Sequence, residues 1–267
     1  MEHQGKLELV DIGANLTHGS FRQDFEQVIQ RAQAAGIATI VVTGASVEGS
    51  EAAVKLAADR APTLYATAGV HPHEAKSFTH STADELRALA SQPAVRALGE
   101  CGLDFHRNLS PRDAQLSAFE AQLELATQLQ LPVFIHDREA HRDLLALLRR
   151  YRDRLADAVV HCFTGQRHEL AAYLDLDLHI GITGWICDER RGLHLRELVR
   201  EIPPRRLMVE SDAPYLLPRT IKPAPSDRRN EPGYLPYVLE VVAQSIGKPA
   251  AEVAAETTRT ARAFFRI

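Results

Sequence analysis

The feature that most constrains the fold is a regular alternation of short apolar runs, rich in β-branched residues, with longer segments of helical periodicity. Apolar residues at every third or fourth position predict an amphipathic helix, whereas a short continuous apolar run predicts a buried strand. The alternation repeats eight times along the 267 residues. It predicts a parallel sheet whose strands are connected by helices.

The expected strands lie at 7–10, 37–42, 63–70, 94–100, 131–136, 158–161, 178–182 and 206–209. The expected helices lie at 21–35, 47–60, 82–91, 111–130, 139–150, 167–174, 193–201, 233–245 and 250–265. The longest irregular segment, 213–232, contains five prolines. A loop of this length inside a domain is usually functional, so we expect it at the rim of a site. No repeat or low-complexity segment interrupts the pattern, and we expect one domain over 1–267.

Four of the expected strands run into a residue that can bind a metal ion, namely Glu100, His136, His161 and Asp212. A carboxylate at the end of a buried strand is costly to desolvate unless a cation or a hydrogen-bond donor compensates. Side chains at the carboxyl ends of many different strands converge only when the sheet closes. We therefore predict an α/β fold of the (β/α)8 TIM barrel class, with a doubly wound open sheet as the competing topology.

Carboxylate and imidazole ligands suit Mg²⁺, Mn²⁺ or Zn²⁺. Cys101 and Cys162 adjoin two of the candidate ligands. Successive side chains on a strand face opposite sides, so we expect both cysteines to pack in the core rather than to bind the ion.

Further polar residues follow the same strands. His71 and His73 flank Pro72, and we expect them to contact substrate rather than metal. Four further residues are expected to contact the ligands rather than the ion, namely Asp11, Asn15, Asp104 and Glu210. The loops after the seventh and eighth strands, where barrels often bind phosphate, carry the predicted substrate-binding residues Arg190, Arg191, Arg228, Arg229 and Asn230.

Composition excludes several classes of protein. A formal charge of −4 argues against coating duplex DNA through bulk positive charge. The three scattered cysteines favour a reducing compartment. Residues 1–6 are polar, and no apolar run reaches the length of about 18 residues that would span a membrane. We expect a cytoplasmic monomer without membrane association.

The ordered motifs resemble those of the TatD family of metal-dependent deoxyribonucleases. They are DIGANLT (11–17), AGVHPH (68–73), GECGLDF (99–105), HCFTG (161–165), GITGW (181–185), ESDAPYL (210–216) and RRNEP (228–232). The resemblance extends from Asp11 to about Phe265. Within the family, the motifs match the member that gave the family its name more closely than its paralogues.

The resemblance implies a TIM barrel of the amidohydrolase-like, metal-dependent hydrolase type. It also implies 3′→5′ exonuclease activity on single-stranded DNA, with RNA as a second candidate substrate, supported by Mg²⁺. By position in the motifs it implies metal ligands at Glu100, His136, His161 and Asp212, with Glu100 and Asp212 also catalytic. Many members begin with Asp-x-His-x-His, where this chain has Gly13 and Asn15. The number of ions, one or two, is therefore open.

A role in DNA repair or nucleic-acid degradation follows from the resemblance. Two other functions stay open. A metal barrel can hydrolyse a small amide, ester or lactone, or the ester of an aminoacyl-tRNA. A non-catalytic role in a DNA-repair or cell-death complex is the third class. The arginines favour a phosphate-bearing substrate, and the intact set of ligand candidates argues against the non-catalytic role.

Overall fold

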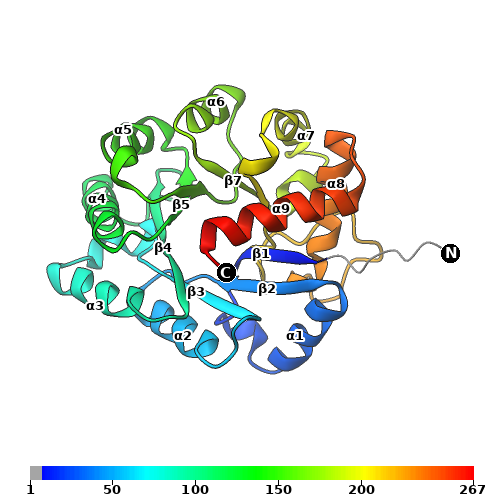
Figure 1. Ribbon diagram of the computed structural model, residues 1–267, viewed down its shortest axis with the longest axis horizontal. Helices are drawn as coiled ribbons and strands as arrows, with labels where there is room; N and C mark the ends of the chain where they lie inside the picture. Colours follow the sequence, from blue (N-terminus) through cyan, green and yellow to red (C-terminus); the bar gives the residue numbers. More distant parts are fainter. Residues whose placement is uncertain (1–7) are drawn as a thin grey trace.

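In the computed structural model, which describes residues 8–267, eight parallel strands form one sheet in the order β1 to β8 (Figure 1). Their bounds are β1 Leu9–Ala14, β2 Ile37–Val42, β3 Leu64–Ala68, β4 Val95–Asp104, β5 Val133–Arg138, β6 Ala158–Val160, β7 His179–Ile182 and β8 Leu207–Val209. Each strand pairs in parallel with the next. The prediction of a (β/α)8 barrel is confirmed. Leu7, the start of the expected first strand, and the polar residues 1–6 lie outside the described residues.

The helices form a ring outside the sheet (Figure 1). They are α1 Phe25–Ala34, α2 Val47–Ala57, α3 His80–Ala90, α4 Arg112–Leu129, α5 His141–Tyr151, α6 Arg167–Asp175, α7 Leu193–Leu198, α8 Leu235–Ile246 and α9 Ala250–Phe265. Helix α9 instead lies across the centre of the ring in this view (Figure 1). Within residues 8–267, no helix combines the length and the apolar character needed to cross a bilayer.

The gap between β8 and β1 is bridged by hydrogen bonds just beyond the end of β8. The backbone N–H of Asp212 donates to the carbonyl of Gly13 at 2.8 Å, and that of Asn15 donates to Ala213 at 2.7 Å. The carboxylate of Asp11 accepts a hydrogen bond from the backbone N–H of Ser211 at 2.9 Å. These contacts bring the segments after β1 and β8 together at one end of the barrel.

Side chains alternate between two cores, as the twofold period of a strand requires. Leu207 and Val209 pack outward beneath the helices, while Met208 between them points into the barrel. The interior cluster also contains Val10, Ile12, Val41, Ala97, Phe134 and Val159. Phe264 and Phe265 of α9 join the same cluster. Helix α9 thus closes one mouth of the barrel, while the strand ends with the candidate ligands lie at the other.

Strand β4 differs from the prediction, because it continues beyond Glu100 to Asp104. Its pairing with β5 shifts between Leu98 and Cys101, and Gly99 and Gly102 have φ values of +134° and +139°. A side chain at either glycine would collide with the backbone carbonyls of β5. The glycines therefore allow the close, irregular approach that places Glu100 within the strand and still directs its carboxylate into the mouth of the barrel.

Candidate metal centre

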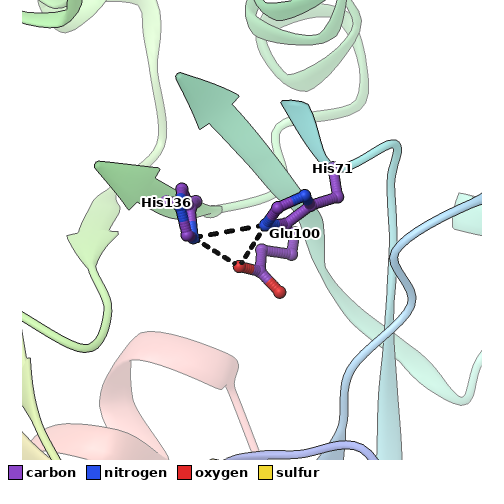
Figure 2. A group of neighbouring side chains, drawn as sticks. All are labelled: His71, Glu100 and His136. Carbon is purple, nitrogen blue, oxygen red and sulfur yellow. Dashed lines mark hydrogen bonds and ion pairs between the residues drawn. The ribbon is translucent and has the colours of Figure 1, made fainter. Parts of the chain in front are cut away.

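Three imidazole rings surround one carboxylate oxygen at the open mouth of the barrel. Glu100 Oε1 lies 3.3 Å from His71 Nε2, 2.9 Å from His136 Nδ1 and 2.8 Å from His161 Nε2. Figure 2 shows His71, Glu100 and His136 pointing toward one another from separate segments. Ligand atoms of these three residues all lie within 4.8 Å of one another, a spacing that could hold a metal ion.

A side chain of the barrel interior packs directly against one histidine of this cluster. The ring of Phe134, on β5, stacks on the ring of His161 with centroids 4.5 Å apart. Phe134 is fully buried, so it gives His161 a fixed apolar floor. His136 follows two residues later on the same strand and therefore points to the same side.

Glu210 contacts His161 at the ring nitrogen opposite the one that faces Glu100. Its Oε2 lies 3.4 Å from His161 Nδ1, and its Oε1 accepts a hydrogen bond from the backbone N–H of Cys162 at 2.6 Å. The carboxylate fits between two glycines, because a Cβ on Gly13 or Gly181 would lie 2.7 Å from one of its oxygens. A carboxylate behind a histidine fixes the ring orientation and makes the opposite nitrogen a better ligand.

Asp104 contacts His73 and His136 in the way that Glu210 contacts His161. Its Oδ2 lies 2.7 Å from His73 Nε2 and 3.5 Å from His136 Nε2. Burial opposes ionisation of this carboxyl, but hydrogen bonds from His136, from the backbone N–H of Arg107 and from His73 hold its pKa below the usual range. His73 therefore lies beside the cluster, braced by Asp104.

Asp212 approaches from the segment after β8, next to Asn15. The side-chain amide of Asn15 donates to Asp212 Oδ1 at 3.2 Å. Burial raises the pKa of Asp212 to about 8, and burial raises that of Asp11 to about 7. A cation at short range would favour the ionised form of Asp212. Asp11 itself joins the backbone of β1 to Ser211 and so fixes where Asp212 emerges.

Charge within the cluster sets which groups are ionised. Burial alone would raise the pKa of Glu100, but the charges of His161 and His71 and hydrogen bonds from His136 and His161 hold it well below its ordinary value. Burial disfavours a charge on His161, yet Glu100 and Glu210 raise its pKa well above the ordinary value. Burial lowers the pKa of His71. A neutral imidazole is the form that binds a metal.

The donor set fits a divalent cation. His136 directs its Nδ1 toward Glu100 Oε1 at 2.9 Å and His71 Nε2 at 3.3 Å, so two imidazole nitrogens and a carboxylate oxygen face one another. Imidazole nitrogens and carboxylate oxygens are ligands for Zn²⁺ and Mn²⁺, and carboxylates also suit Mg²⁺. The two cysteines beside the ligands stay out of this set: Cys101 is fully buried in the core, and the thiol of Cys162 lies 3.6 Å from the hydroxyl of Thr183.

The arginines after β7 reach solvent near the site. The guanidinium groups of Arg190 and Arg191 both contact the carboxylate of Asp188, and both side chains are more than 60% exposed. Arg191 also lies over the ring of Trp185, 4.3 Å from its centroid. Contact of these arginines with substrate stays a prediction.

The basic residues of the loop after β8 have structural partners. Arg229 binds both carboxylate oxygens of Asp24 and lies over the ring of Phe21. Arg31 of α1 binds Glu231 in the same network. Arg228 is exposed. Arg229 therefore ties the loop to the start of α1, and its predicted contact with substrate is untested.

Asn230 is buried and clamps the segment that carries Asp212. Its side-chain amide donates to the carbonyls of Ser211 at 2.8 Å and Tyr215 at 2.7 Å. Its backbone N–H donates to the carbonyl of Pro214 at 3.0 Å. These bonds hold the turn around Asp212 in place. Whether Asn230 also touches substrate is untested.

Replacing Asn230 with alanine is expected to lower the free energy of unfolding by about 1–3 kcal/mol, because two buried carbonyls lose their donor. The displaced Asp212 should also lower the rate of the reaction catalysed at this metal centre by about 10- to 100-fold. Thermal melts and initial rates would measure both effects. Gln244→Ala, which removes an exposed amide on α8 that contacts Glu240, is the matched control and should change neither. Equal behaviour of the two variants would contradict the clamp.

The sequence predicted that the four ligand candidates lie at one end of the barrel, but it assigned His71 to contact with substrate rather than metal. The signal for His71 was present, because it follows β3 as His161 follows β6 and Asp212 follows β8. The partners of Arg229 and Asn230 could not be read from the sequence. Asp24 lies 205 positions from Arg229, and nothing local marks the pair.

Comparison with known proteins gives the site its context. The family model described as TatD related DNase matches residues 10–266. A protein named 3′-5′ ssDNA/RNA exonuclease TatD from Salmonella typhimurium is 49% identical over 259 residues, covering 97% of this chain and 99% of the relative. The crystal structure of a TatD homologue from Escherichia coli K12 superposes with a TM-score of 0.89 at 27% identity, covering 98% and 100% of the two chains.

A more distant structure shares the barrel fold alone. The phosphotriesterase homology protein of Escherichia coli superposes with a TM-score of 0.66 at 12% identity, over 96% of this chain and 99% of the other. The family resemblance drawn from the motifs is confirmed by the match over residues 10–266. The chain belongs to the family of TatD-related DNases.

Proposed function

We propose that this protein is a metal-dependent 3′→5′ exonuclease that removes nucleotides from single-stranded DNA or RNA. The observation that carries the proposal is the convergence of three imidazoles on Glu100 at the open mouth of a TatD-family barrel. The relative at 49% identity is named a 3′-5′ ssDNA/RNA exonuclease. Such an activity suits the removal of single-stranded ends in nucleic-acid degradation or DNA repair.

The proposed ligands are Glu100, His136, His161 and Asp212, with His71 close enough to join them. A bound Mg²⁺, Mn²⁺ or Zn²⁺ would polarise the phosphoryl oxygen and lower the pKa of water. Asp212 takes the proton from the attacking water. The new bond joins the water oxygen to phosphorus. The bond that breaks joins phosphorus to the 3′ oxygen of the preceding nucleotide. That oxygen takes up a proton, and the terminal nucleotide leaves with its 5′-phosphate.

Glu210 and Asp104 are proposed to keep His161 and His136 in orientation while charge develops on the phosphate. The ligands come from β4, from β5 and from the segments directly after β6 and β8 of one chain. We therefore propose that residues 1–267 act as one hydrolase domain and as a monomer, since no second copy is needed to complete the set.

Removal of metal is the direct test. Protein stripped with a chelator should release no nucleotide from a 3′-labelled single strand, because no cation offsets the charge on the phosphate. Adding Mg²⁺, Mn²⁺ or Zn²⁺ separately should restore release, and metal analysis of the restored sample gives the number of ions. A small carboxylic ester and an aminoacyl-tRNA are assayed in parallel. Hydrolysis of either ester without nucleotide release would overturn the proposal in favour of the alternative hydrolase.

A further inference from the structure

A pocket of about 400 Å³ lies at the carboxyl ends of β5, β6 and β7, where the loops that follow these strands line it. Two of its wall residues, Arg138 and Val160, are close chain neighbours of the ligand candidates His136 and His161. Its far side is formed by Trp185 and by Leu195 of α7. The pocket therefore lies at the same end of the barrel as the cluster around Glu100, and none of its described lining residues is a proposed ligand.

One aromatic ring and two guanidinium groups dominate the pocket. The ring centroid of Trp185 lies 5.5 Å from the guanidinium carbon of Arg138 and 4.3 Å from that of Arg191. Arg191 also binds Asp188. Across residues 8–267, no carboxylate lies within ion-pair distance of Arg138, so its positive charge is available to a ligand. An indole ring beside arginine is a combination that binds a base and a phosphate together.

The acidic residues of the wall already have donors, which reduces their repulsion of a phosphate. Asp137 accepts hydrogen bonds from the Tyr173 hydroxyl and the backbone N–H of Ala140. Glu139 contacts His106 at 2.7 Å. Glu169 accepts the backbone N–H of Gln166 at 2.6 Å at the start of α6.

We propose that this pocket receives the 3′-terminal nucleotide of the single strand. Its base stacks on Trp185, and the phosphate to be cleaved lies between Arg138 and the metal centre. This inference rests on the proposed function and specifies how that site recognises a strand end. Pockets for small ligands have volumes of about 300–1,000 Å³, so this one has room for one nucleotide rather than a length of strand. Such a pocket restricts cleavage to the end of a chain.

A binding experiment tests the pocket without any turnover. Trp185 is the only tryptophan in the chain, so intrinsic indole fluorescence reports on this site alone. Deoxyadenosine 5′-monophosphate should quench it saturably, while inorganic phosphate should not. Arg138→Ala should weaken the affinity for the nucleotide about tenfold or more, because it removes a charge-assisted hydrogen bond. Arg150→Ala removes an arginine that lies over Tyr151 and binds Glu120, and it serves as the matched control.

A kinetic experiment locates the base. With the intact strand, Trp185→Ala should lower kcat/KM by roughly 10- to 100-fold, and Trp185→Phe should recover most of the loss. On a strand whose terminal nucleotide is abasic, Trp185→Ala should cause no loss. An abasic penultimate nucleotide should leave the full loss in place.

Several results would overturn the pocket assignment. These are no quenching by the nucleotide, equal affinity in Arg138→Ala and wild type, the same loss with intact and abasic ends, or a loss that follows the penultimate base. Failure of the proposed function looks different, because the wild-type protein would then release no nucleotide under any metal. The fluorescence titration still decides the pocket in that case.

Discussion

Replacing Glu100 with glutamine is expected to lower the rate of nucleotide release about 10³-fold or more. The carboxylate oxygen that three histidine rings face becomes part of a neutral amide. A bound metal contributes several kcal/mol to transition-state stabilisation, and each 1.4 kcal/mol corresponds to a factor of ten. Glutamine has nearly the same shape, so the barrel should remain folded. Initial rates, metal content after dialysis and thermal melts measure the three consequences separately.

Glu124→Gln is the control for this variant. Glu124 lies on α4 and makes a surface ion pair with Arg154, where an exposed carboxylate contributes little. It should keep the rate and metal content of the wild type. A Glu100→Gln protein that retains full metal content and full activity would remove Glu100 from the proposed metal centre.

Replacing Phe265 with alanine is expected to lower the free energy of unfolding by about 3–5 kcal/mol. Phe265 is 1% exposed and belongs, with Phe264, to the cluster that fills the barrel interior. Truncation leaves a cavity at the closed mouth, because the close-packed side chains of the barrel interior cannot collapse to fill it. Chemical denaturation at 25 °C and a thermal melt would measure the loss.

Tyr237→Ala is the comparison for Phe265→Ala. Tyr237 is an aromatic residue of α8 that is 43% exposed, and its truncation should change stability far less. The closed mouth is opposite the metal centre, so the kcat of folded Phe265→Ala should match the wild type at 25 °C. Equal loss of stability in both variants would show that α9 does not seal the barrel.

Sequence patterns predicted the barrel well, for a definite physical reason. Strand and helix periods are local properties, and the ends of parallel strands meet at one face once the sheet closes. Glu100, His136, His161 and Asp212 could therefore be grouped without coordinates. The same reasoning ended β4 at Glu100, because it could not foresee that Gly99 and Gly102 carry an irregular strand onward to Asp104.

Contacts between distant side chains were out of reach. The stacking of Phe134 under His161 depends on the twist of two strands, not on any spacing in the sequence. The pocket at Trp185 likewise depends on where three loops meet. The sequence shows the residue type at positions 134 and 185, but only tertiary packing determines which residues contact them.

The position of the Glu210 carboxylate between Gly13 and Gly181 affects which substitutions related chains can accept. A side chain at either glycine would require the carboxylate to move, because its first carbon would lie 2.7 Å from a carboxylate oxygen of Glu210. Related chains that carry the histidine of Asp-x-His-x-His in place of Gly13 should therefore hold the carboxylate of residue 210 in a different position.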